Sequence, residues 1–379
     1  MAISRTINCK DCGHINTFKK KQLLDLKKSP KCERCQQELL RYFSRPMTGL
    51  LAESFIHPLD VQMLKALKKI PGIDSVLRSL LEHSFEMSMR LHHQANYVEI
   101  SDKQLKNLYQ KMLVAAQALD IDDLPELYLV QDAKAMAYTF GVKRCAIAIS
   151  SGLIELLSDD EITSVIAHEL GHIKAKHVLY KTASRILATI ADTIANRTFG
   201  LGGLILHPIQ IALLRWDRAS ELSADRASLL VVKNPMIVLN SLMKMAGGSS
   251  SIAHELNIDS FIKQAERFLE TQREGILGKY IAVMNSLFST HPFPIWRARE
   301  LIDWVLTGDY LDLLADERPI TPSDVHARCP TCKSIVSEKE DMCPVCQGHE
   351  ETSNSGDKLK KTISDIRSWY NRNFNDGDN

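Results

Sequence analysis

The 379-residue sequence predicts an α+β protein with a mainly helical core, a small antiparallel sheet and a cysteine-rich domain at each end. Stretches with apolar residues at helical spacing, and three short strand-like runs near residue 140, predict the core. Eight of the nine cysteines fall in four Cys-x-x-Cys pairs, two towards each end, and predict the end domains. The content of 45% apolar and 25% charged residues is typical of a globular protein.

Each group of four cysteines has the spacing of a zinc ribbon, in which the thiolates hold one structural zinc ion. Disulfide-stapled loops are the alternative, but residues 1–30 are polar and lysine-rich and do not resemble a signal peptide. The ninth cysteine, Cys145, is most simply a buried thiol in a strand. The first group is Cys9, Cys12, Cys32 and Cys35, and the second is Cys329, Cys332, Cys343 and Cys346.

Five segments follow from this pattern. We expect an N-terminal ribbon at 1–45, a helical lead-in at 46–122 and a core at 123–315, then a second ribbon at 326–350 and a polar tail at 351–379. In the lead-in, an amphipathic helix is expected from Ser101 to Leu119, capped by Ser101 and Gln104. In the tail, a short helix is expected near Lys358 to Tyr370.

The predicted strands of the core are Leu127 to Val130, Lys134 to Phe140 and Cys145 to Ser150, with Gly141 in a turn between the last two. An edge strand of such a sheet can pair with an extended peptide. A sheet that only packs against helices is an equally good interpretation.

The most informative motif is His168-Glu169-Leu170-Gly171-His172, which reads H-E-x-x-H. Ser158 and Glu161 form a capping box that starts a helix in front of it. Histidines at i and i+4 share one face of a helix and can bind one zinc ion, while the glutamate acts on a water at the metal. In a chain with thirteen histidines the pattern arises by chance in about one chain in thirty, so the context must decide.

A catalytic zinc site needs a third protein ligand. His177 does not fit the spacing H-E-x-x-H-x-x-G-x-x-H, and we interpret it as a surface histidine near a helix end. Glu221 and Asp225 lie at i and i+4 in a second predicted helix. Glu221 suits the third ligand, and Asp225 suits the partner that orients a ligating imidazole. The alternative for these two acids is a solvated helix face.

With these motifs in place, the stretch from about Leu127 to Arg299 resembles the M48 family of metallopeptidases. The resemblance rests on four elements in the family's order. They are Ser151-Gly152-Leu153, the H-E-L-G-H motif, Glu221-x-x-Ala-Asp225, and His291-Pro292 followed by Arg297. The chain departs from the family where it has Met136-Ala137 in place of Asn-Ala, which bears on substrate contact at that strand.

The resemblance implies a zincin-like metallopeptidase core and a zinc-dependent metalloendopeptidase acting on proteins or peptides, with Glu169 as general base. It also implies that His291 stabilises the oxyanion or adds a zinc ligand, and that Arg297 holds the loop or the transition-state charge. Turn and surface roles are the alternatives for these two residues. The competing function is a catalytically silent zinc-ribbon adaptor or chaperone-like binding protein. The total expected is three zinc ions, one catalytic and two structural.

Partners and location are less constrained. The ribbons suit a protein partner, while the net charge of +1 gives no support for nucleic-acid binding despite lysines at 19–21, 27 and 28. The segment 199–214 is apolar but too short to span a membrane, and His207 and Pro208 interrupt it. It is either a buried helix-turn segment or a surface hairpin that contacts a membrane or covers the site. The predicted location is cytoplasmic, with peripheral membrane contact as the alternative.

Overall fold

The fold was analysed in a computed structural model of the chain. The structure describes residues 4–43, 47, 49–69, 73, 85–141, 144–184, 201–273, 293–315, 327–328 and 335–336. His291, the four cysteines of the C-terminal ribbon and the tail helix near 358–370 lie outside these residues. Of the C-terminal ribbon, only a short antiparallel pair is described, β7 (Ala327–Arg328) with β8 (Ile335–Val336).

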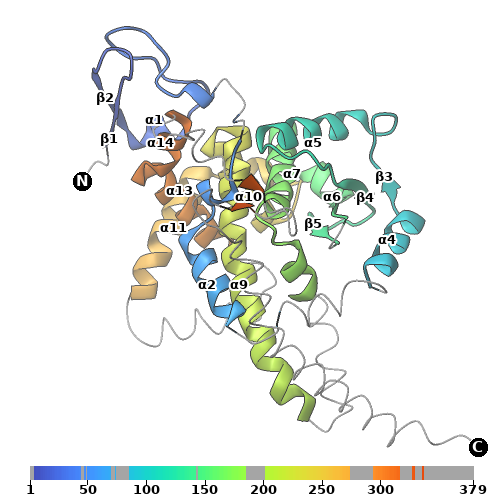
Figure 1. The fold of residues 1–379 in the computed structure, drawn as a ribbon. Coiled ribbons are helices and arrows are strands. Elements are labelled where there is room, and N and C mark those ends of the chain that lie inside the picture. The colour runs from blue at the N-terminus through green and yellow to red at the C-terminus, as the bar shows by residue number, and fades with distance from the viewer. Residues whose placement is uncertain are drawn as a thin grey trace, which may run out of the picture.

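Two helices packed side by side form the centre of the molecule, α7 (Asp159–Lys174) and α9 (Leu201–Val232) (Figure 1). Gly171 allows their close approach, because a Cβ built at this position would lie 2.6 Å from Cβ of Ala227 and 3.3 Å from Cα of Ala224. The other helices pack around this pair: α2 (Pro58–Lys68), α5 (Lys106–Ala118), α10 (Pro235–Gly247), α11 (Ile258–Arg273), α13 (Pro294–Thr307) and α14 (Asp309–Ala315).

A four-stranded sheet lies beside α7, in the order β3–β4–β6–β5. Its strands are β3 (Val98–Glu99), β4 (Glu126–Val130), β5 (Ala137–Phe140) and β6 (Ala146–Ser150). The α+β class is confirmed, but the sheet is mixed and not purely antiparallel, since β4 and β6 run parallel. β6 lies between β4 and β5, and it runs parallel to β4 and antiparallel to β5. β5 is therefore an edge strand of the described sheet.

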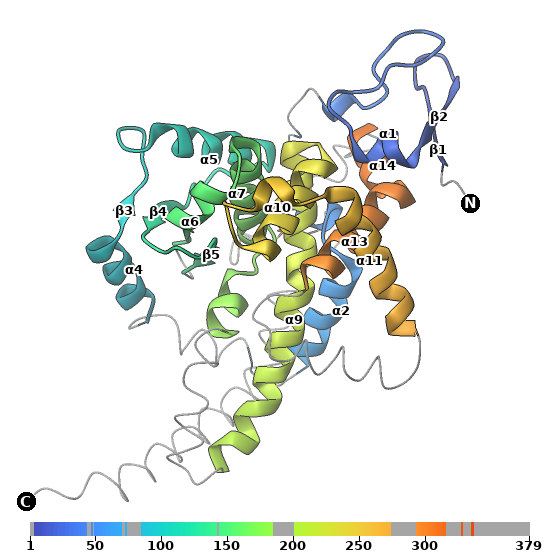
Figure 2. The ribbon, with the colours of Figure 1, turned by 180° about the vertical axis from the view of Figure 1, so that it is seen from behind.

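Two shorter helices flank the sheet. α4 (Phe85–Asn96) precedes β3, and α6 (Ser151–Leu156) follows β6 directly, with the Ser150 side chain accepting a hydrogen bond from the Leu153 N–H. Seen from behind, α4, the sheet and α6 lie on one side of the α7–α9 pair, and α11 and α13 lie on the other (Figure 2).

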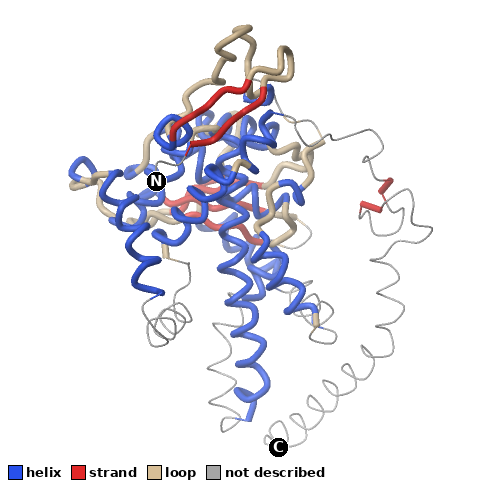
Figure 3. The backbone as a smooth tube through the Cα atoms, turned by 90° about the vertical axis from the view of Figure 1, so that its left-hand side faces the viewer, coloured by secondary structure: helices blue, strands red, loops and turns tan. Residues whose placement is uncertain are grey.

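The N-terminal segment packs against the helical core. The hairpin of β1 (Ser4–Asn8) and β2 (Ile15–Lys19) leads into α1 (Lys20–Leu24), and α1 packs on α13. Two short 3-10 helices, Arg41–Phe43 and Ala52–Ser54, follow, and the first lies against α14. Figure 3 shows this hairpin at one end of the helical core, far from the first turns of α9.

Two expectations about helices were wrong. The helix expected from Ser101 begins at Lys106, because Ser101 and Gln104 exchange backbone hydrogen bonds in a turn, and Leu105 has a φ of 58° that a helix cannot contain. From Leu201 onward the segment 199–214 is neither a hairpin nor a helix-turn element but the first part of the single continuous helix α9.

Candidate active site

The capping box predicted from the sequence starts α7 and so fixes its register. The Ser158 N–H donates to Oε2 of Glu161 at 2.7 Å, and acidic residues in the first turn complement the helix dipole. Ile162, Ile166 and Leu170 lie at helical spacing on α7 and are buried in the main core. His168 and His172 therefore lie on a different face, which α9 covers.

Three buried side chains converge between α7 and α9. His168 Nε2 lies 3.3 Å from Oε2 of Glu221, and His172 Nε2 lies 3.3 Å from Oε1 of the same carboxylate. The candidate ligand atoms of the three residues all lie within 4.8 Å of one another. His172 Nε2 is buried without a hydrogen-bond partner, which is costly unless another group binds it. Two imidazoles and one carboxylate form the ligand set of a catalytic zinc site, so these residues fit the metal.

Charges around the two histidines differ. Burial and the positive charge of Lys181 lower the pKa of His172 well below its usual value, so this imidazole is neutral and offers a lone pair. Burial opposes protonation of His168 too, but hydrogen bonds with Asp225 and Glu221 raise its pKa to about 9 in the metal-free protein. The two imidazoles thus start from opposite protonation states before metal binding.

Asp225 and Arg297 form a buried clamp on His168. Asp225 Oδ1 lies 3.0 Å from His168 Nδ1, and Arg297 donates to both oxygens of Asp225 at 2.8 and 2.6 Å. Burial raises the pKa of Asp225, but the charge and hydrogen bonds of Arg297 and the contact with His168 bring it below its usual value. Arg297 Nη1 also lies 3.4 Å from Glu221 Oε2. Asp225 is therefore ionised and can accept a hydrogen bond from the imidazole N–H.

Glu169 faces the edge strand of the sheet. Thr139 of β5 is fully buried, and its hydroxyl donates to Oε2 of Glu169 at 2.6 Å. The same hydroxyl lies 3.3 Å from the Glu169 carbonyl oxygen. β5, an edge strand among the described strands, and the candidate general base are therefore connected directly.

The expectation that His177 is a surface residue was wrong. It is 2% exposed, and its Nδ1 lies 3.1 Å from Nδ1 of His172. The cause is a turn at the end of α7, where Lys176 adopts a φ of 59° and the His177 N–H donates to the His172 carbonyl at 2.9 Å. This turn places the His177 ring beside that of His172.

Sequence reasoning also missed Thr139, Lys181 and Asp60. Lys181 donates to Oδ1 of Asp217 at 2.7 Å and to Oε1 of Glu221 at 2.5 Å. Lys181 follows His177 by four residues in a helical stretch, and that spacing was the only signal for it in the sequence. Asp60 lies far from the motif in the sequence and could not have been found without the fold.

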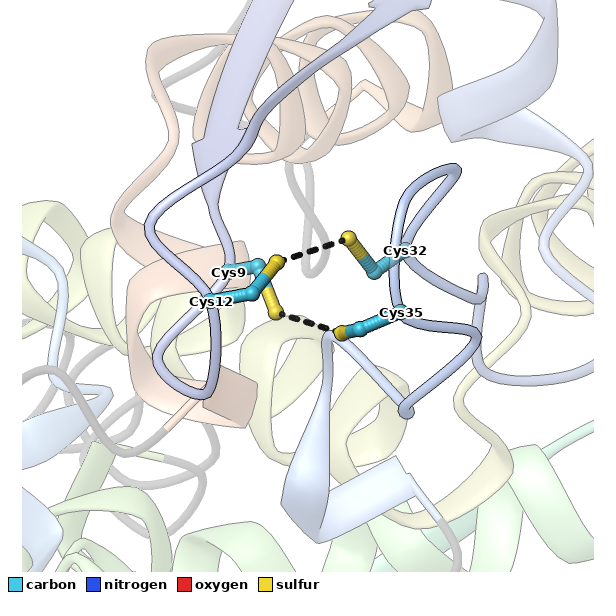
Figure 4. A group of neighbouring side chains, drawn as sticks. All are labelled: Cys9, Cys12, Cys32 and Cys35. Carbon is cyan, nitrogen blue, oxygen red and sulfur yellow. Dashed lines mark hydrogen bonds between the residues drawn. The ribbon is translucent and has the colours of Figure 1, made fainter.

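The N-terminal cysteines come together as predicted (Figure 4). The Sγ atoms of Cys9 and Cys35 lie 3.5 Å apart and those of Cys12 and Cys32 lie 3.6 Å apart, and one atom from each cysteine lies within 4.8 Å of the others. Burial raises the pKa of Cys32, but hydrogen bonds from backbone N–H groups, Cys12 and Asn16 lower it to about 6. Such a thiol is readily available as a thiolate ligand.

Comparison with known proteins agrees with this geometry. The sequence model of peptidase family M48 matches residues 100–305. The chain is 38% identical over 265 residues to "Plastoglobule-localized metallopeptidase 48, chloroplastic" of Arabidopsis thaliana, covering 69% of this chain and 75% of the relative. It is 25% identical over 248 residues to a "Protease HtpX homolog" of Burkholderia mallei (strain SAVP1), covering 60% of this chain and 83% of the relative. No solved structure matches the chain.

The three converging side chains, which could hold a metal ion, and the adjoining edge strand are typical of a zinc metallopeptidase. The chain belongs to peptidase family M48, and the resemblance expected from the motifs is confirmed. It is a zinc-dependent hydrolase of protein or peptide substrates. Among the described residues, no helix is both long and apolar enough to cross a bilayer.

Proposed function

We propose that His168, His172 and Glu221 hold the catalytic zinc ion of this metalloendopeptidase, and that Glu169 is its general base. The observation that carries the proposal is the convergence of three buried ligand groups around His172 Nε2, which has no hydrogen-bond partner. When bound, zinc supplies a Lewis acid that polarises the scissile carbonyl and lowers the pKa of water. Glu169 takes the proton of the attacking water and passes it to the leaving amine.

Substrate binding is proposed at β5. An extended peptide that pairs with this edge strand adds a fifth strand to the sheet. The hydrogen bond between Thr139 and Glu169 supports this placement, because it sets the base next to the strand on which the peptide would lie. Met136, at the start of this region, replaces the residue usual in the family and is a candidate determinant of substrate preference.

Arg297 is proposed as a positioning residue. Its Nε and Nη2 groups are both used by Asp225, which favours holding that carboxylate over stabilising transition-state charge. His291 keeps its two predicted roles, oxyanion stabilisation or additional zinc binding, and lies outside the described residues.

The test of the catalytic proposal is Glu169→Gln, which removes the base and leaves the proposed zinc ligands. We expect zinc binding as in the wild type and no cleavage of casein beyond background. Glu155→Gln, an exposed change on α6, is the matched control and should cleave at the wild-type rate. Equal cleavage by Glu169→Gln would reject Glu169 as the base. The silent-adaptor alternative predicts that the wild type itself shows no cleavage.

Three zinc ions per chain are proposed: one at the catalytic site, one at Cys9, Cys12, Cys32 and Cys35, and one at the C-terminal cysteines. Metal analysis of the purified protein should return three, of which a chelator removes one first. A value of two that is unchanged by His172→Ala would remove the catalytic ion from this account.

A second proposal concerns peripheral membrane contact by the first turns of α9, which extend beyond the neighbouring helices (Figure 1). The plastoglobule location in the relative's name and the exposed Ile211 support it. Liposome flotation of Ile211→Glu tests it, with Ile252→Glu, at another exposed isoleucine, as control. Flotation of both variants at the wild-type level would reject membrane contact there and leave the predicted cytoplasmic location and a ribbon-bound protein partner as the remaining predictions.

A further inference from the structure

A buried chain of hydrogen bonds leads from α2 to the zinc ligand His172. Asp60 of α2 is 1% exposed, and its Oδ2 lies 3.0 Å from Nε2 of His177. The other ring nitrogen of His177, Nδ1, lies 3.1 Å from Nδ1 of His172. The second nitrogen of His172, Nε2, is the candidate metal ligand. The three residues thus connect a helix near the N-terminus to the metal position.

The partners of Asp60 fix it as an acceptor. The indole N–H of Trp216 donates to Oδ1 at 2.9 Å, and a tryptophan nitrogen can only donate. The Ser223 hydroxyl accepts from the His57 N–H at 3.0 Å and donates to Oδ2 at 2.6 Å. Burial raises the pKa of Asp60, but these bonds and the contact with His177 bring it below its usual value. The carboxylate is therefore ionised, and the nitrogen of His177 that faces it must carry a proton.

This requirement determines the protons along the chain. With its ring proton on Nε2, facing Asp60, His177 presents the lone pair of Nδ1 to His172, so Nδ1 of His172 is the donor between the two rings. His172 with its proton on Nδ1 has its lone pair on Nε2, the nitrogen that would bind the metal. The opposite tautomer of His177 would direct a lone pair at the Asp60 carboxylate and is excluded.

We propose that Asp60 and His177 are positioning residues that hold His172 in the tautomer required for zinc binding. The inference rests on the proposed metal site. His168 has a carboxylate, Asp225, directly on its Nδ1, whereas His172 reaches its carboxylate through a second imidazole. Asp60 precedes residues 100–305, the part matched by the family, so the segment N-terminal to the matched region supplies a component of the site.

Two variants test the relay. His177→Phe keeps a ring but removes the acceptor. Asp60→Asn keeps the shape, but Trp216 holds its amide oxygen, so the NH₂ group faces His177 and reverses the tautomer of that ring. We expect both to weaken metal binding at the His₂Glu site about 10- to 100-fold, the usual effect of losing such a partner. His177→Asn places an oxygen near the Nδ1 position and should recover most of the affinity.

The measurement is titration of the full chain with Co²⁺, whose absorption separates nitrogen and oxygen coordination from thiolate coordination at the ribbons. Long-range ¹⁵N–¹H NMR correlations should show His177 protonated on Nε2 in the wild type and on Nδ1 in Asp60→Asn. His93→Phe is the control, since it removes another buried, hydrogen-bonded histidine and should leave cobalt affinity unchanged.

Wild-type affinity in both His177→Phe and Asp60→Asn would overturn the relay, as would a wild-type His177 protonated on Nδ1. Affinity lost equally in His177→Phe and His177→Asn would also overturn it, because general damage to the fold would then explain the loss. A wild-type protein that binds no cobalt outside the ribbons would instead reject the proposed metal site, so the two failures are distinguishable.

Discussion

Lys181 places a buried positive charge against a carboxylate that is proposed to bind zinc. Its side chain and that of Glu221 are each 4% exposed, and Lys181 also pairs with Asp217. Removing one partner of a buried ion pair is costly, because the other charge is left buried without an opposite charge beside it. A zinc ion bound by Glu221 would supply positive charge at the same carboxylate, so it would neutralise Glu221 alongside Lys181.

Lys181→Met should therefore destabilise the metal-free protein more than the zinc-loaded one. We expect a loss of about 3–5 kcal/mol in unfolding free energy without zinc, as for other broken buried pairs, and a smaller loss with zinc. The thermal shift on adding zinc should be larger than in the wild type. Lys244→Met is the control, because Lys244 pairs with Glu161 away from the metal and its loss should not depend on zinc. An unchanged zinc-induced shift in Lys181→Met would contradict this account.

Thr139 is the second residue whose effect can be separated from metal binding. Thr139→Val keeps the side-chain volume and removes the 2.6 Å hydrogen bond to Glu169. Hydrogen bonds to charged groups contribute about 1.5–3 kcal/mol, so kcat should fall about 10- to 100-fold while zinc affinity stays unchanged. Thr163→Val, which removes a hydroxyl bond to the Asp159 carbonyl on the same helix as Glu169, should leave kcat unchanged. A loss of zinc affinity in Thr139→Val would show that Thr139 supports the fold of the site and not the base.

At the scale of elements, the separation of α7 and α9 determines whether the ligand set can form. His168 and His172 lie on α7 and Glu221 lies on α9, so any increase in their separation moves the carboxylate away from both imidazoles. Gly171 lies between the two histidines in the sequence, and a Cβ at this position would meet Ala227 and Ala224 of α9. The glycine of the motif is therefore explained by helix packing.

Gly171→Ala should force the helices apart. Its Cβ would meet Ala227 at 2.6 Å, and such overpacking costs about 1–3 kcal/mol. We expect lower stability together with weaker zinc binding, measured by urea unfolding and cobalt titration. Gly247→Ala, at the end of α10, meets only Leu256 side-chain carbons at 3.4 and 3.7 Å and should be neutral or slightly stabilising. Unchanged zinc affinity in Gly171→Ala would show that the two helices can adjust without moving Glu221.

The sequence was sufficient where local rules and function agree. The capping box at Ser158 and the i, i+4 pairs of the motif and of Glu221 with Asp225 each depend on the spacing within one helix. His177 could not be placed from the sequence, because its position depends on the left-handed backbone conformation of Lys176. Glycine commonly indicates such a conformation at a helix end, and lysine does not. The contribution of Asp60 depends on how α2 packs against α9, which no local pattern encodes.

For the whole molecule, the N-terminal ribbon is part of the same apolar core as the peptidase helices. Leu23, Leu24, Leu39 and Leu40 are buried in one cluster with residues of α13 and α14. Two ion pairs join the ribbon to α14 and α11, Arg5–Asp312 at 3.5 Å and Lys20–Glu266 at 2.7 Å. All four side chains are partly exposed, and such pairs contribute little. Apolar burial therefore holds the ribbon in place.

This arrangement predicts that the ribbon metal stabilises the peptidase core. Cys12→Ser with Cys35→Ser should abolish metal binding at the ribbon and release its leucines from the surface of α13. Re-exposing even two of the four leucines costs about 3–6 kcal/mol, and the loss should appear in the cooperative urea unfolding of the whole chain. Because α13 carries Arg297, the clamp on Asp225 should loosen and zinc affinity at the catalytic site should fall as well.

Cys145→Ser is the control, since it removes a thiol away from the ribbon, and it should change stability by less than about 1 kcal/mol. If the ribbon folds independently of the core, the double variant should lose only the unfolding transition of the ribbon. The unfolding of the core should then be unchanged.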